Sequence, residues 1–353
     1  MTTHHLPKFE GQIGNTLEDS EAHFPSRSHP GEDAPNVVII LVDDTGFSQL
    51  GCYGSDIDTG HLDALAAGGL QFTNFHVTPL CSPTRASLLT GRSQHSVGMR
   101  SVSNHQTGFP HQLGHITNHA ATIAEVLQSE GYATFCAGKW HLAPTNDISA
   151  AGPFDQWPLA RGFDRFYGFL EGETDQFYPE LVVDNHRIEA PGSPEDGYHL
   201  SEDLVEQLLW MINDSKGVRS DRPFFAYLPF GATHAPHQAP EAYLQKYRGR
   251  YDQGWDITRE DWYRKQLELG VTSEQTQLAP RNDGVEAWVD LPETHQALAC
   301  RLQEAFAAFL DHTDDQIGRF IAGLEEMNEL ENTILVFLAD NGASQEGGPY
   351  GVM

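Results

Sequence analysis

The chain has few cationic residues, few cysteines and no long apolar run. Its 353 residues include 21 Lys and Arg against 50 Asp and Glu, which gives a formal net charge of −29. This shortage of positive charge argues against nucleic acid as a partner, because little is available to neutralise phosphates. No apolar stretch approaches the length of a bilayer span, so we expect no membrane partner either.

The cysteines are too few and too scattered for a disulfide framework or a CxxC zinc site. They stand at Cys52, Cys81, Cys136 and Cys300, so we expect free thiols and a reducing compartment. Residues 1–35 are polar and lack the apolar core of a signal peptide. We therefore expect an irregular N-terminal segment and a cytoplasmic protein.

What is present is an ordinary globular composition with alternating strand and helix patterns. Hydrophobic residues make up 39% of the chain and charged residues 20%. Helices are expected at 122–130, at 201–211 behind a partial capping box, and at 293–327. This alternation predicts an α/β fold with a doubly wound, mostly parallel sheet flanked by helices.

Four apolar runs predict strands, and polar residues suited to chemistry follow each of them. In open α/β sheets ligands bind at the carboxyl ends of the strands, so these polar residues are candidates for one site. The runs are 37–42 before Asp43 and Asp44, 132–136 before Lys139 and His141, 224–228 before His234, and 333–338 before Asp340 and Asn341.

One stretch, at about 243–291, does not share the alternation. It is polar, contains Trp255, Trp262 and Trp288, and shows no clear period. We interpret it as an insertion. It either borders the substrate entrance or is an inert surface excursion, and the sequence favours neither.

The strand-end carboxylates predict a metal site. Asp43, Asp44, Asp340 and Asn341 form an oxygen-only set, which suits Ca²⁺ or Mg²⁺ and not Zn²⁺. Without a cation, three clustered carboxylates would raise one another's pKa values. The alternative for residues 340–342 alone is a plain Asn-Gly turn.

The pentapeptide 81–85, Cys-Ser-Pro-Thr-Arg, precedes a predicted helix that stops at Gly91. Pro83 suits a first helical turn, so Cys81 should sit at a helix N-terminus, where the partial positive charge favours a nucleophile or an anion. On the pentapeptide alone, a buried structural cysteine remains an alternative.

Residues 80–91 resemble the signature of the type I, formylglycine-dependent sulfatases of the alkaline phosphatase superfamily. Further segments resemble the same family in the same order: Asp43-Asp44, the Gly-Lys-Trp-His-Leu of 138–142, the segment 229–237, and the Asp-Asn-Gly of 340–342. The resemblance covers about residues 36–351, is greatest to the bacterial arylsulfatases, and implies an alkaline-phosphatase-like fold.

The resemblance implies a modified nucleophile and a metal. A formylglycine-generating maturation enzyme would convert Cys81 to Cα-formylglycine, whose hydrate attacks the sulfur of a sulfate ester. One divalent cation, Ca²⁺ rather than Mg²⁺, would hold a sulfate oxygen and act as a Lewis acid. Its implied ligands are the modified residue 81 together with Asp43, Asp44, Asp340 and Asn341.

The resemblance also implies roles for four other side chains. Lys139 would contact both the sulfate and the modified residue, and His141 would deprotonate the remaining hydroxyl so that sulfate leaves. His234 would bind the sulfate and protonate the leaving oxygen, which suits an imidazole. Arg85 would bridge the nucleophile and the metal carboxylates.

Two elements of the family have no counterpart in the sequence. No Lys follows Asn341, where the family carries a second sulfate-binding Lys, and the smaller C-terminal domain of the family is missing. The chain ends in turn-like sequence at 347–353. We therefore expect residues 36–353 to be the catalytic domain of a protein truncated at its C-terminus.

The predicted function is a sulfuric ester hydrolase of arylsulfatase type, acting on a small-molecule sulfate ester. Two alternatives remain open: a phosphonate monoester or phosphodiester hydrolase of the same superfamily, and a non-catalytic metal-binding relative. A cysteine hydrolase with Cys81 activated by His141 or His234 would leave the strand-end carboxylates unexplained.

Overall fold

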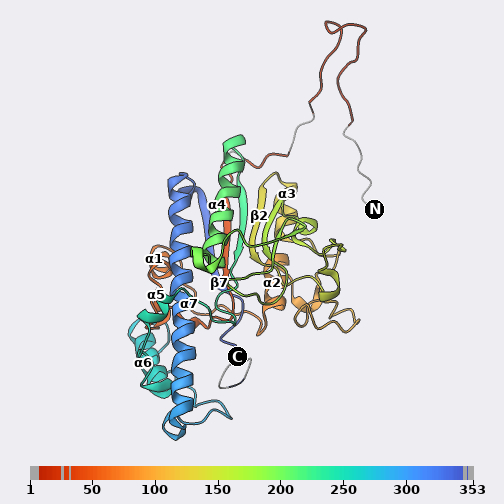
Figure 1. Ribbon diagram of the computed structural model, residues 1–353. Coiled ribbons are helices and arrows are strands. Elements are labelled where there is room, and N and C mark those ends of the chain that lie inside the picture. The colour runs from red at the N-terminus through yellow and green to blue at the C-terminus, as the bar shows by residue number, and fades with distance from the viewer. Residues whose placement is uncertain (1–7, 25–27, 32, 345–347, 349–353) are drawn as a thin grey trace.

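The computed structural model describes residues 8–24, 28–31, 33–344 and 348, and a seven-stranded sheet forms its centre (Figure 1). Across the sheet the order is β5 (His186–Ile188), β4 (Leu181–Val183), β3 (Arg165–Phe169), β2 (Ala133–Lys139), β6 (Phe224–Pro229), β1 (Asn36–Val42) and β7 (Thr333–Ala339). In this order each strand from β3 to β7 runs parallel to its neighbour, whereas the pairs β3–β4 and β4–β5 are antiparallel. The mostly parallel sheet is confirmed, although β3, β4 and β5 were not foreseen.

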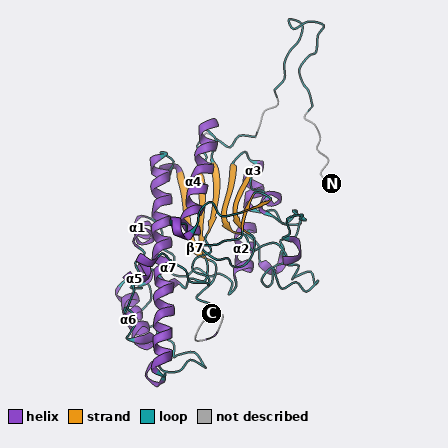
Figure 2. Cartoon of the chain, viewed as in Figure 1, coloured by secondary structure: helices purple, strands orange, loops and turns teal. Residues whose placement is uncertain are grey.

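Helices cover both faces of the sheet. The helices in the described residues are α1 (Gly60–Gly68), α2 (Cys81–Thr90), α3 (Ile123–Ser129), α4 (Leu200–Val218), α5 (Glu241–Lys246), α6 (Gly254–Glu268) and α7 (Glu293–Glu326). Figure 2 shows α4 and α7 on one side of the strands and α2 and α3 on the other. Among the described residues, none of the helices is both long enough and apolar enough to cross a bilayer.

The sheet separates two hydrophobic cores, and β1 contributes to both. Val38, Ile40 and Val42 pack into the core that contains α4 and α7, whereas Ile39 and Leu41 pack into the core that contains α2. This division follows from the strand period of two. Because each fully buried aliphatic side chain contributes roughly 1.5–3 kcal/mol, the continuous apolar run of β1 stabilises both layers.

The bounds predicted for α3 and α7 are confirmed to within one residue, whereas the end predicted at Met211 is wrong, because α4 continues to Val218. The helix α2 begins at Cys81 and is closed by Gly91 in the left-handed conformation, with φ at 63°. The predicted start of the next long helix at Ser201 is wrong, because α4 begins at Leu200. His199 caps it instead, and its ring nitrogen accepts a hydrogen bond from the Ser201 amide at 3.2 Å.

The predicted insertion contains regular structure. The 15-residue helix α6 forms within it and lies beside the lower half of α7 in Figure 1. Its sequence showed no period because polar residues occupy most of its faces. The described part of residues 1–35 has no helix; it contains a bridge between Gln12 and Glu21, and His29 pairs with Asp221. Apart from Gly348, the turn-like C-terminal end lies outside the described residues.

Two glycines lie where the carboxyl ends of three strands leave no room for a side chain. Gly138 of β2 pairs with Gly168 of β3, and their φ angles are 135° and 151°. A Cβ on Gly138 would lie 1.9 Å from the carbonyl oxygen of Pro229 in β6, and one on Gly168 would lie 2.0 Å from the carbonyl oxygen of Gly138. Only glycine fits both positions.

Candidate active site

The candidate site begins where β1 and β7 end side by side. Val42 pairs with Ala339 in the parallel register, so the next residues, Asp43 and Asp340, leave the sheet together. The Asp340 amide donates to the Val42 carbonyl at 3.1 Å, which extends the pairing by one step. Two carboxylates that are almost 300 residues apart in sequence are thus neighbours because of the strand register.

Asp44 and Asn341 complete this edge. The Asp44 amide donates to Asp340 Oδ1 at 3.4 Å, and Asn341 Nδ2 donates to Asp44 Oδ1 at 2.6 Å. Asp44 has a positive φ of 54°, a conformation that costs energy outside glycine and that concentrates at functional sites. The structure therefore joins the two predicted pairs, Asp43-Asp44 and Asp340-Asn341, into one group of side chains.

The donor atoms of this group fit a hard divalent cation. Asp43 Oδ1 and Asn341 Oδ1 are buried and have no hydrogen-bond partner within the described chain. Asp43, Cys81 and Asp340 each offer a ligand atom, and these atoms lie within 4.8 Å of one another. Burial raises the pKa of Asp340, as does the neighbouring Asp43. A cation would offset this cost of ionisation, and oxygen donors are the ligands that Ca²⁺ and Mg²⁺ prefer.

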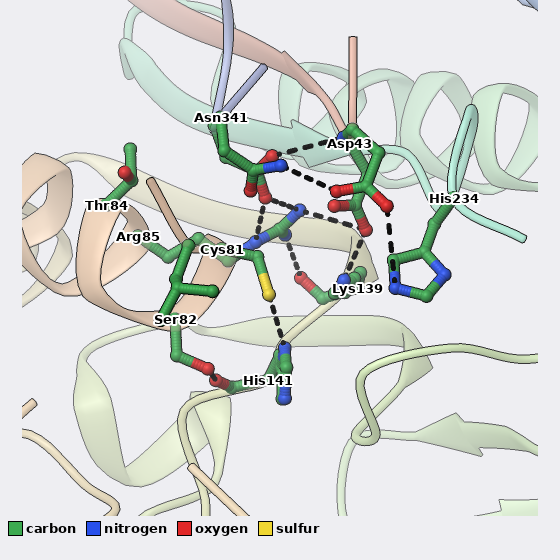
Figure 3. A network of polar contacts seen from close by, with 12 residues as sticks. Asp43, Cys81, Ser82, Thr84, Arg85, Lys139, His141, His234 and Asn341 are labelled. Atoms are coloured by element: carbon green, nitrogen blue, oxygen red, sulfur yellow. Dashed lines mark hydrogen bonds and ion pairs between the residues drawn. The ribbon is translucent and has the colours of Figure 1, made fainter. Parts of the chain in front are cut away.

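Two buried cations face these carboxylates (Figure 3). Arg85 donates from Nε and Nη2 to Asp340 Oδ2 at 3.0 and 2.8 Å, and from Nη1 to the Lys139 carbonyl at 3.1 Å. The Lys139 ammonium pairs with Asp43 Oδ2. Burial works to lower the pKa of each cation, but the carboxylates more than offset it. The pKa of Arg85 and that of Lys139 are therefore both raised, and both side chains stay charged.

The charge balance explains how an acidic protein can hold an anion here. Three carboxylates, Asp43, Asp44 and Asp340, face two cations, which leaves one net negative charge when all are ionised. A bound divalent cation would make the group positive. A local positive potential is what an anionic ester needs against the overall charge of −29.

Cys81 lies at the first position of α2 and points at this group. The residue is 8% exposed, and its Sγ lies 3.1 Å from His141 Nδ1. Burial raises the pKa of the thiol, and the nearby Asp43 adds to this although Lys139 opposes it. A thiol that resists ionisation is a poor nucleophile as it stands, which argues against a cysteine hydrolase.

His141 is held as a neutral base beside Cys81. Burial, together with the charges of Lys139 and Arg85, lowers the pKa of His141 well below its ordinary value. Its Nε2 is buried with no partner in the described chain, and its φ of 51° is positive. A neutral imidazole can accept a proton, so the environment suits a base and not an acid.

His234 approaches the group from the loop after β6. Its Nε2 lies 3.7 Å from Asp44 Oδ2. Its Nδ1 lies 2.8 Å from the Ala235 carbonyl and 3.7 Å from Glu173 Oε2. An Nδ1–H that donates to the Ala235 carbonyl would orient the ring so that Nε2 faces the carboxylates.

All the predicted site residues meet at this one edge of the sheet, although their catalytic roles stay predictions. Sequence reasoning missed two hydroxyls that position them. Ser82 Oγ donates to the His141 carbonyl at 2.7 Å, and Thr233 Oγ1 donates to the Asp43 carbonyl at 3.0 Å. Both stand next to predicted residues, but only the folded backbone shows which carbonyl each one reaches.

Comparisons with known proteins identify the family. The family model described as Sulfatase matches residues 35–352. The chain is 34% identical over 334 residues to an uncharacterized sulfatase of Schizosaccharomyces pombe, covering 88% of this chain and 58% of that one. It is 30% identical over 336 residues to an arylsulfatase of Klebsiella aerogenes, covering 90% of this chain and 68% of that one.

A solved structure shares the fold. The PsFucS1 sulfatase of a Pseudoalteromonas species superposes with a TM-score of 0.58 at 23% identity, covering 88% of this chain and 55% of that one. This chain therefore spans less than two thirds of the fission yeast relative and of this structure. With the family model matching nearly its whole length, the chain belongs to the sulfatase family.

Proposed function

We propose that this chain carries the catalytic centre of an arylsulfatase-type hydrolase that cleaves a sulfate monoester to a phenol or alcohol and sulfate. The proposal includes conversion of Cys81 to Cα-formylglycine by a maturation enzyme, and one bound divalent cation, Ca²⁺ rather than Mg²⁺. One observation carries it. Cys81 sits at a helix N-terminus against a neutral His141, within reach of Asp43 and Asp340.

The formylglycine at position 81 and the divalent cation would supply the nucleophilic and electrophilic chemistry. The hydrated aldehyde at position 81 would provide the attacking hydroxyl, and the cation would polarise the sulfate. The protein's own cations would hold the carboxylates and the nucleophile in place. Arg85 fixes the Asp340 carboxylate, and Lys139 interacts with both Asp43 and residue 81.

Two histidines divide the proton transfers. His141 accepts the proton of the hydroxyl that remains at position 81 once the leaving group has gone, because its environment keeps the imidazole neutral. His234, on the Asp44 side of the site, donates a proton to the leaving oxygen.

The first experiment is mass spectrometry of the peptide that bears residue 81, from protein co-expressed with a formylglycine-generating enzyme. We expect the mass to fall by the thiol-to-aldehyde difference and the peptide to react with a hydrazide. A peptide that keeps its thiol, while a control sulfatase is converted, would sink the proposed mechanism and favour a non-catalytic relative.

The second experiment measures substrate choice in the matured protein with calcium present. Sulfate release from 4-nitrophenyl sulfate is compared with hydrolysis of a phosphonate monoester and of a phosphate diester that carry the same leaving group. We expect the sulfate ester to have the highest kcat/KM. A higher value for the phosphonate would replace the proposed activity with the superfamily alternative.

A further inference from the structure

A cleft of about 570 Å³ extends from the site along the inserted segment, between α6, η7 (Trp288–Asp290) and α7. Asp44 and Thr233 line it next to the site, and so do Ala235 and His237, just past His234 in the chain. A leaving group whose oxygen is held by His234 therefore lies next to this cleft. Its volume falls within the range of small-molecule sites.

Three tryptophans from the inserted segment line the cleft. The rings of Trp255 and Trp288 meet edge to face with their centroids 5.0 Å apart. Trp255 donates its indole N–H to the Glu286 carbonyl at 3.2 Å, and Trp262 donates to Asp56 Oδ1 at 2.8 Å. Since these two donors are satisfied within the protein, these rings offer the cleft apolar surface and not hydrogen bonds.

The part of the inserted segment that lines the cleft is held in place by specific contacts. The Trp288 amide donates to Asp256 Oδ2 at 2.9 Å, and Arg281 pairs with Asp256 Oδ1 at 3.0 Å. Gln296 of α7 donates to the Trp288 carbonyl at 2.8 Å. The inserted segment is thus tied both to itself and to α7, which an inert surface excursion would not need.

The lining has little charge with which to bind a polyanion. Among the lining residues that the structure describes, only Asp44 and Arg259 carry a formal charge, and Arg259 already donates to the Ala279 carbonyl at 2.9 Å. Burial lowers the pKa of His237, so that this ring is neutral near pH 7. Phe306 of α7 adds a further aromatic surface. This composition matches a planar apolar group.

We propose that this cleft binds the aromatic ring of an aryl sulfate, and that Trp255, Trp262 and Trp288 determine selectivity for aryl over alkyl esters. The inference rests on the proposed sulfatase function for its choice of ligand. It assigns the inserted segment a role in specificity, and it places that role on residues outside the charged site.

The test separates the cleft from the chemistry. Calorimetry measures binding of 2-naphthol, which has the ring of an aryl ester but no sulfate, to the intact protein. We expect Trp255→Ala to weaken binding about tenfold and Trp255→Phe to restore most of it, because an aromatic contact is removed and then replaced. The matched control is Trp210→Ala on α4, a tryptophan that is 52% exposed and not part of the lining; it should change nothing.

The kinetic arm compares 2-naphthyl sulfate with octyl sulfate in the matured protein. Trp255→Ala should raise KM for the naphthyl ester about tenfold with little change in kcat, and should affect the octyl ester less. Two outcomes overturn the inference. Either 2-naphthol does not bind the wild type, as would happen if another part of the protein fills the cleft, or it binds Trp255→Ala as tightly as the wild type. Absence of sulfate release from either ester overturns the proposed function instead, since calorimetry alone decides the cleft.

Discussion

The charged site and the aromatic cleft meet at Asp44 yet are built in opposite ways. In the site, fully buried ions hold one another, as Arg85 and Asp340 do. In the cleft, partly buried rings are pinned by their backbones and indole nitrogens, as Trp255 and Trp288 are. The site depends on charge balance, whereas the cleft depends on shape. Chemistry and recognition are thus set by separate parts of the chain, and substitutions should separate them.

The largest effect is expected from Asp43→Ala. It removes a candidate metal ligand and leaves Lys139 and Arg85 buried with one fewer carboxylate, which costs about 3–5 kcal/mol in unfolding free energy. Bound calcium and sulfate release should both be lost. Elemental analysis and urea unfolding measure these effects. Asp58→Ala, at an exposed pair with Lys246, is the control and should lose less than about 1 kcal/mol. Stoichiometric calcium in Asp43→Ala would refute the metal assignment.

Cys81→Ala should separate activity from stability within the charged site. The change removes only the sulfur that precedes the proposed nucleophile, so sulfate release should fall by a factor of about 10³ or more while Arg85 and Asp340 stay paired. The unfolding free energy should change by less than about 2 kcal/mol, because a single buried atom is lost. Thermal unfolding and sulfate release are the measurements. Retained turnover would show that residue 81 is not the nucleophile.

Gly254→Ala should damage the cleft and spare the site. Gly254 has a φ of 78°, and a Cβ there would lie 2.1 Å from the Trp288 ring, so that the ring must move. We expect KM for aryl sulfates to rise about fivefold, within the range of a lost aromatic contact, with unchanged calcium content. Gly270→Ala is a matched control, since its φ of 69° brings the same backbone strain but no atom lies within 4 Å of the added Cβ. Equal KM values for the two variants would contradict the placement of Trp288.

The smallest effect is expected from a substitution of His199, which caps α4 and lies outside both the charged site and the cleft. Burial and the neighbouring His312 lower its pKa to about 3, below the roughly 6.5 of an unfolded chain. As the pH falls, His199 is therefore protonated in the unfolded chain before it is protonated in the folded protein. The stability that neutral His199 provides is present above about pH 6.5 and is lost as the pH falls towards 3.

His199→Asn keeps a side chain that can cap α4 and removes this titration. The unfolding free energy should therefore fall less between pH 7 and pH 5 in the variant than in the wild type. Urea titrations at the two pH values measure the difference. An identical fall in both proteins would show that His199 does not contribute to acid sensitivity.

The sequence predicted the site better than the cleft because the site is made of local patterns. Each strand-end motif, such as Asp43-Asp44, joins a recognisable apolar run to polar residues, and parallel pairing brings the strand ends together. The register that aligns Val42 with Ala339 could not be predicted, because register depends on tertiary packing. The short strands β4 and β5 were missed, since three residues are too few to show a period.

The cleft could not be foreseen for a different reason. Its tryptophans are scattered over a polar segment, and their contacts run to Glu286, Asp56 and Asp256, none of which shares a motif with them. The predicted start of α4 was wrong for a related reason. His199 occupies the capping position that sequence rules assign to Ser201. Specific tertiary contacts decided both cases.

The glycine pair at the ends of β2 and β3 bears on how such a protein can change over generations. Gly138 and Gly168 admit no side chain, so any substitution there would push the strand ends apart and carry Lys139 away from Asp43. Mutations at this edge are therefore expected to be purged. The tryptophan-bearing segment has no such constraint on most of its positions, so new ester preferences can arise there while the reaction itself is inherited unchanged.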